Sequence, residues 1–130
     1  PSTSERVITV GAYDSANIST VGFSGRGYTR ATEYIKPDLV APGVNILTTT
    51  VGESITSFTG TSAAAPFVAG SAALLMEWGI VDRNDIFLYG ERLKAFLCNG
   101  AIRDNSREYP NREWGYGRLC LKNTLDLLKK

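Results

Sequence analysis

Residues 62–78 form the longest run of small and apolar side chains in the sequence, with Glu77 as its only charged member. A helix that is apolar on every side, rather than along one stripe, is expected to be buried all round. We therefore predict a central buried helix over residues 62–78 that ends near Gly79. The alanines of this run and Gly70 would let neighbouring backbones come close to the helix.

Four short runs rich in β-branched and apolar residues predict strands before this helix. Residues 7–10 (VITV) and 38–41 (DLVA) have the apolar character of buried strands in a parallel sheet. Residues 44–51 and 55–58 predict the two arms of a hairpin, connected at residues 52–54.

Two more helices are predicted after the central one. Apolar positions between residues 85 and 98 share one helical face, and Asn99-Gly100 would end that helix. Leucines spaced over residues 121–128 predict a last short amphipathic helix. This order of elements places the chain in the α/β class with a mostly parallel sheet, and residues 1–130 have the length of one domain.

Composition argues against several classes of partner. The chain of 130 residues carries a net charge of +1, so its electrostatics favour neither nucleic acid nor an anionic membrane. We expect no membrane-spanning helix, because Glu77 interrupts the longest apolar run. Residues 1–20 show no signal-peptide pattern, and the compartment is left open. Cys98 and Cys120 are too few for a disulfide framework or a metal cluster, so we expect two core thiols and no metal site.

Two other patterns receive structural interpretations. The three glycines within residues 22–27 do not predict a phosphate-binding loop, because no helix opens directly from them. Trp114 and Tyr116 lie in a loop-like stretch from residue 101 to residue 117. We expect these aromatic side chains to pin that loop to the core rather than to form a binding face.

Ser62 is the candidate catalytic residue. It follows Gly60 and Thr61, so it lies where the chain enters the central helix. Backbone N–H groups without partners and the positive end of the helix dipole are found there. A hydroxyl beside such donors provides the attacking atom and part of an oxyanion hole for acyl transfer. A serine at a helix start is more often only a cap, and the residue alone does not decide between the two roles.

The segment around this serine, residues 60–70 (GTSAAAPFVAG), resembles the nucleophile motif of the subtilisin-like serine proteases, the subtilases or peptidase S8 family. Residues 23–27 (FSGRG) and 36–43 (KPDLVAPG) are similar to two further stretches of that family, in the same order. The resemblance covers essentially the whole chain. It implies the C-terminal part of a subtilisin-like three-layer α/β fold, in which Ser62 is the nucleophile of a serine endopeptidase.

The same resemblance bears on other residues. It places Thr61 near the oxyanion, where its hydroxyl would assist, although a residue that only packs the turn is an equal alternative. Residues 78–81, 88–91 and 114–117 look most like subtilases of clostridial type, some of which process spore-germination proteins.

The sequence contains no histidine, whereas a catalytic serine needs a base to take its proton. In the resembled family the aspartate, the histidine and the oxyanion asparagine precede the serine. We therefore expect a single partial domain that carries the nucleophile and is nearly inert alone. Its expected partners are a peptide or protein substrate, the upstream half of its own catalytic domain, and a second copy through self-association.

An alternative is a subtilase-like pseudoprotease that acts as a binding or regulatory module. No cofactor is expected in this chain. The resemblance leaves calcium dependence of the parent protein and side-chain specificity open.

Overall fold

The computed structural model describes residues 2–52 and 54–130, and its centre is a small sheet with the strand order β2-β1-β3. β1 (Val10–Asp14) pairs in parallel with β3 (Leu39–Pro42) and antiparallel with β2 (Ser19–Thr20). The far edge of β3 is met by the chain near its end, where Arg118 forms a parallel bridge with Val40. The mixed α/β content predicted from the sequence is therefore confirmed, with the parallel pair at its centre.

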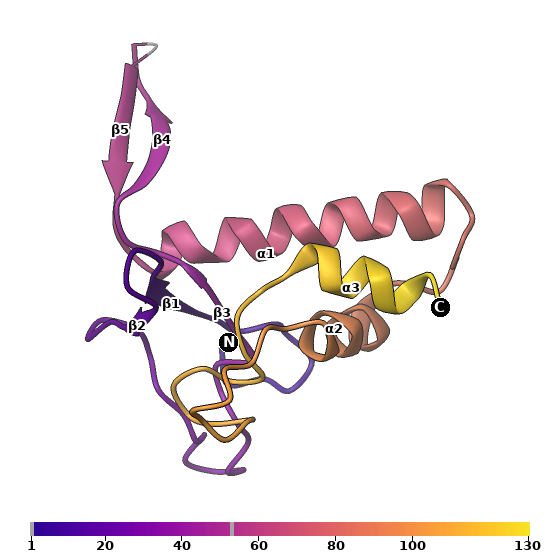
Figure 1. Cartoon of the computed structure of the whole chain (residues 1–130), viewed down its shortest axis with the longest axis horizontal. Coiled ribbons are helices and arrows are strands. Elements are labelled where there is room, and N and C mark those ends of the chain that lie inside the picture. Colours follow the sequence, from indigo (N-terminus) through magenta and orange to yellow (C-terminus); the bar gives the residue numbers. More distant parts are fainter. Residues whose placement is uncertain (1, 53) are drawn as a thin grey trace.

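A long helix, α1 (Thr61–Met76), lies along one side of this sheet (Figure 1). It continues directly into a π-helical turn, η1 (Glu77–Val81), so the helical stretch extends past Gly79, the predicted end. The buried side chains of α1 recur at the spacing of one helical face and are Ala63, Ala64, Val68, Ser71 and Leu75.

The other face of α1 is exposed within this chain. Phe67 and Leu74 on that face are about half exposed, so the predicted burial on every side is met on one face only. The residues Thr61–Val81 are also long and apolar enough to cross a membrane, which corrects the expectation drawn from Glu77. A single helix of this length and composition is weak evidence for a membrane span, and 22% of its apolar window is buried within this chain, where α1 packs on β1 and β3.

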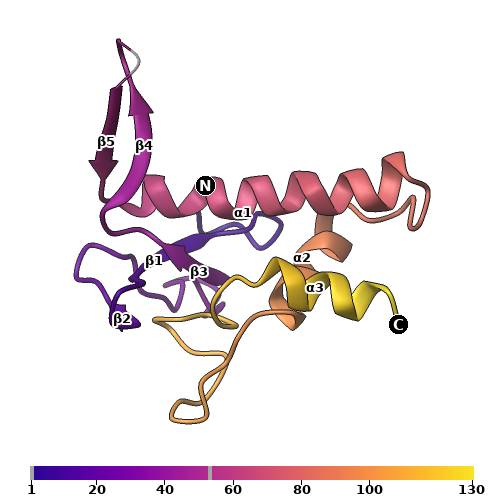
Figure 2. The same cartoon turned by 45° about the horizontal axis from the view of Figure 1, so that its top comes forward.

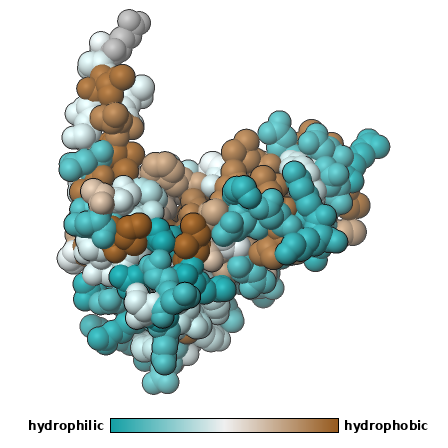
Figure 3. Space-filling view, viewed as in Figure 1, coloured by the Kyte–Doolittle hydropathy of each residue, from teal (hydrophilic) through white to brown (hydrophobic). Residues whose placement is uncertain are grey.

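An antiparallel hairpin, β4 (Ile46–Thr50) and β5 (Ser54–Phe58), stands out from the body of the molecule just before α1 (Figures 1 and 2). The two predicted arms are confirmed, while the predicted connection includes Glu53, which lies outside the described residues. Apolar side chains cover much of the projecting hairpin in the space-filling view (Figure 3). Leu47 and Ile55 are 76% and 73% exposed, so this surface is not covered by the described part of the chain.

Two shorter helices complete the molecule. α3 (Leu121–Leu128) has the predicted bounds, but α2 (Gly90–Asn99) begins five residues later than the predicted start at residue 85. The reason is Leu88, which is fully buried against Gly79 and is brought there by a turn in which its N–H donates to the Asp85 carbonyl at 3.1 Å.

Strand β1 also differs from its prediction over residues 7–10, because it begins at Val10 and runs on to Asp14. Gly11, taken as the end of the strand, lies inside it opposite Val40. A Cβ atom at Gly11 would lie 2.8 Å from Cγ of Pro37, so the glycine serves close packing rather than a turn.

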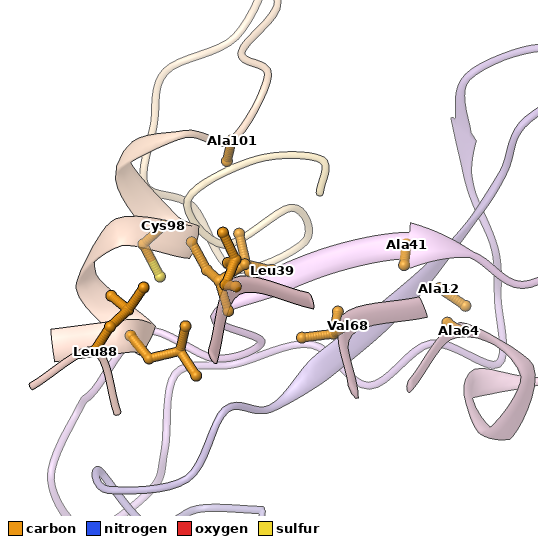
Figure 4. Packing of buried hydrophobic residues seen from close by; sticks show 11 residues of the cluster. Ala12, Leu39, Ala41, Ala64, Val68, Leu88, Cys98 and Ala101 are labelled. Carbon is orange, nitrogen blue, oxygen red and sulfur yellow. The ribbon is translucent and has the colours of Figure 1, made fainter. Parts of the chain in front are cut away.

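The core joins the sheet to the helices. Figure 4 shows Ala12 and Ala41 of the two parallel strands beside Ala64 of α1, with Val68 further along, and Leu39 facing the α2 side chains. Small residues dominate where α1 crosses the sheet, which lets the helix start lie close to the ends of β1 and β3.

Candidate functional site

The turn after β3 fixes the start of α1. The Gly43 N–H donates to the Tyr13 carbonyl at 3.0 Å, and the Gly60 N–H donates to the Gly43 carbonyl at 2.8 Å. A Cβ atom at Gly43 would lie 2.6 Å from Cβ of Ala12, so only glycine allows this approach. The ends of both parallel strands and the first turn of α1 are thus tied together in one place.

Ser62 is the second residue of α1 and is exposed. Gly60, not Ser62, holds the N-cap position, and its carbonyl accepts the N–H groups of Ala63 at 3.0 Å and Ala64 at 3.3 Å. Over residues 2–52 and 54–130, no protein acceptor takes the N–H of Ser62. Ser62 therefore does not cap the helix. Its free N–H donor and its hydroxyl lie together at the positive end of the helix dipole.

Ser62 borders a hollow of about 370 Å³. One wall comes from the start of α1, with Thr61 and Ala65, and the other from the segment that leads into β1, with residues 7–10. A larger hollow of about 630 Å³ reaches from Thr61 across the loop at residues 25–32. Thr61 is half buried and borders both hollows, so the structure is compatible with either of its two predicted roles.

Neither cysteine borders the hollows at Ser62 and Thr61, and Cys98 is also a poor nucleophile. Both thiols are free, and burial, followed by the nearby Asp38 charge, raises the pKa of the Cys98 thiol to about 11. A thiol with such a pKa is almost entirely protonated near neutral pH and is a poor nucleophile. The described residues hold no group of three or more histidine, cysteine or acidic side chains placed to hold a metal ion.

The structural interpretations made from the sequence are confirmed. The loop with the three glycines opens into no helix, and its Gly27 N–H donates to the carbonyls of Lys36 at 2.6 Å and Arg112 at 3.1 Å. Trp114 is 1% exposed and packs on Tyr13 with ring centroids 5.7 Å apart. It is a core residue rather than part of a binding face.

The sequence analysis missed the pocket wall made by residues 7–10 and the charged side chains that support it. The apolar pattern of residues 7–10 predicts a buried strand, and a buried strand is not expected to border an open hollow beside Ser62. The supporting Lys94 lies in α2 and contacts a segment 87 residues away in the chain, at Val7. No local pattern predicts such a contact.

Comparison with known proteins agrees with this geometry. Residues 1–117 match the model of the subtilase family, peptidase S8. The chain is 51% identical to the CspB protease of Clostridium perfringens over its whole length, with a TM-score of 0.96, and it covers 28% of that structure. It is 30% identical to the patellamide maturation protease PatA, with a TM-score of 0.77, over 99% of this chain and 45% of that one.

Curated relatives include the serine protease AprX of Bacillus subtilis, which is 32% identical over 96% of this chain. A PII-type proteinase of Lactococcus lactis subsp. cremoris is 37% identical over 73% of it. The chain spans 31% of the length of AprX and 6% of the length of the lactococcal proteinase. The match over most of the chain, in sequence and in fold, shows that it belongs to the subtilase family.

Proposed function

We propose that this chain is the nucleophile-bearing part of a serine endopeptidase and that Ser62 attacks the peptide carbonyl. The observation that carries the proposal is the position of Ser62 in the first turn of α1, exposed to a hollow and with its N–H free of protein acceptors in the described residues. A structural serine at a helix start would use its oxygen as the cap, whereas here Gly60 occupies that position.

The proposed reaction divides the work between this chain and a segment that precedes it in the family order. The Ser62 oxygen forms the bond to the carbonyl carbon while a histidine outside these residues takes its proton. The Ser62 N–H and an asparagine, also outside these residues, hold the oxyanion. Protonation of the leaving amine gives the acyl-enzyme, and water then releases the acid and restores the serine.

Two observations support the proposal that an upstream half of the catalytic domain supplies the histidine and the asparagine. The chain has no histidine, and it spans only 28% of the CspB structure that it matches over its whole length.

For Thr61 we propose oxyanion support by its hydroxyl. Its place beside Ser62 on both hollows supports this assignment.

The test is intact-mass analysis after treatment with a fluorophosphonate, applied to this chain and to the full-length protein that contains it. We expect one adduct on the full-length protein, lost in Ser62→Ala, and no adduct on the chain alone. Thr61→Val keeps the shape of the side chain and removes the hydroxyl, and it should slow labelling without abolishing it. No labelling of the full-length protein would refute the proposal and favour a binding module, and labelling of the chain alone would refute the need for an upstream half.

A further inference from the structure

Three charged side chains meet in the interior behind the pocket wall. The Asp38 side chain is 4% exposed, and it is flanked by the side chains of Lys36, 8% exposed, and Lys94, 17% exposed. The Lys36 Nζ atom lies 2.7 Å from Oδ2 of Asp38, and the Lys94 Nζ atom lies 2.8 Å from Oδ1. Buried charges are costly, and such pairs stabilise a fold little compared with apolar packing, so their value is better sought in what they position.

The same three side chains hold the backbone of the segment that leads into β1. The Thr9 N–H donates to Oδ2 of Asp38 at 2.7 Å. Both ammonium groups donate to the Val7 carbonyl, at 3.2 Å from Lys36 and 3.0 Å from Lys94. One backbone carbonyl and one backbone N–H are thereby fixed to the residues just before β3 and to α2 by charge-assisted hydrogen bonds, which are stronger than neutral ones.

Further hydrogen bonds anchor the earlier residues of the same segment, residues 2–9. Lys94 also donates to the Glu5 carbonyl at 2.7 Å, and the Thr9 hydroxyl donates to the Ser2 carbonyl at 2.6 Å. Members of this segment also line the hollow at Ser62, namely Ser2, Val7, Ile8, Thr9 and Val10. The charged cluster is therefore attached to the back of a wall whose front faces the candidate nucleophile.

We propose that Lys94 is a positioning residue for substrate: by anchoring residues 5–9 to Asp38, it sets the distance between the pocket wall and Ser62. Lys94 is not among the residues that line the hollow at Ser62, so it acts only through the wall. The inference rests on the proposed endopeptidase function, because it assigns a purpose to the wall of that site.

Loss of this anchor has a defined kinetic signature. A wall that moves weakens contacts with the bound peptide, which are made in the ground state and the transition state alike, so KM rises while kcat stays nearly constant. A small fluorophosphonate, which needs the activated Ser62 and the oxyanion donors but no extended peptide contacts, should react at an unchanged rate. A general loss of structure would instead lower kcat and the labelling rate as well.

The experiment compares Lys94→Met, which keeps the length of the stem, with Lys94→Arg, which keeps the charge, in the full-length protein. Lys122→Met is the matched control, because the Lys122 side chain is 81% exposed and pairs with Asp126 within α3. The readouts are kcat and KM for an extended peptide substrate, the rate of fluorophosphonate labelling, and amide hydrogen exchange at residues 7–10.

We expect Lys94→Met to raise KM about fivefold, with kcat and labelling within about twofold of wild type. Amide hydrogen exchange at residues 7–10 should become faster in Lys94→Met. Lys94→Arg should keep both KM and the exchange rate near their wild-type values. The proposal is overturned if Lys94→Met behaves like Lys122→Met in KM and exchange, or if kcat and labelling fall together with kcat/KM. If the wild-type protein neither cleaves nor labels, the proposed function fails, and unchanged exchange in Lys94→Met would overturn the anchoring role separately.

Discussion

Replacing Gly79 with alanine tests how closely η1 packs on the turn that precedes α2. A Cβ atom at Gly79 would lie 2.9 Å from the Asp85 carbonyl oxygen and 2.9 Å from both Cβ and Cδ2 of Leu88. Carbon atoms in ordinary contact lie about 3.5 Å apart, so each of the two contacts with Leu88 would be about 0.6 Å too short. The Gly79 carbonyl accepts the Asp85 N–H at 3.0 Å and Leu88 is fully buried, so neither neighbour has room to move.

The expected magnitude follows from two opposing effects. Overpacking of this kind costs up to about 3 kcal/mol. The better helix propensity of alanine returns about 1 kcal/mol. We therefore expect Gly79→Ala to lower the free energy of unfolding by about 2 kcal/mol, which corresponds to a fall in Tm of about 8 °C for a domain of this size.

The control is a glycine in the same helical stretch with open space around it. A Cβ atom at Gly70 in α1 would meet nothing within 4 Å, so Gly70→Ala in the 130-residue chain should gain about 0.5–1 kcal/mol from propensity alone. Urea unfolding of both variants and the wild-type chain, followed by circular dichroism, measures the difference. Equal shifts, or a gain in stability for Gly79→Ala, would show that the space around Gly79 is not as tight as the structure indicates.

Two further predictions concern reactivity and association. Because the pKa of the Cys98 thiol is raised to about 11, the rate of its alkylation by iodoacetamide should rise about tenfold per pH unit from pH 8 to 10. Cys98 should also react more slowly than the half-buried Cys120, and equal rates at pH 8 would contradict the burial of Cys98. The unfolded state has the lower thiol pKa, so this group should lower stability as pH rises above 9 towards 11. The isolated chain should also self-associate through the hairpin, where Leu47 and Ile55 lie on one face, and the double variant Leu47→Lys with Ile55→Lys should shift light-scattering mass towards monomer. A wild-type chain that stays monomeric at high concentration would refute this.

Local patterns predicted the elements that depend on local chemistry. The helix at residues 121–128 is where the spacing of leucines places it, and both arms of the hairpin lie where β-branched residues predict strands. The start of α1 is also correct within one residue, because glycine and small residues mark the turn that feeds it. These features need no knowledge of what the segment packs against.

Several failures come from tertiary contacts that a local pattern does not encode. The sequence predicts that Gly11 ends a strand, but in the structure Pro37 and Val40 lie so close to it that no larger residue fits. The start of α2 was placed too early because the burial of Leu88 against Gly79 overrides its helical pattern. The charged cluster behind the pocket wall was invisible for the same reason.

The helix α1 carries both the candidate nucleophile and an apolar face that the described part of the chain leaves uncovered. Ser62 lies in its first turn without a histidine anywhere in the sequence, and Phe67 and Leu74 leave an apolar face open further along the same helix. Under the proposed function, the upstream part of the catalytic domain would cover this face and bring its histidine to the helix start. Under the proposed function, burial of α1 and assembly of the catalytic site are then one event, so the free energy of covering the apolar face would hold the histidine in place beside Ser62.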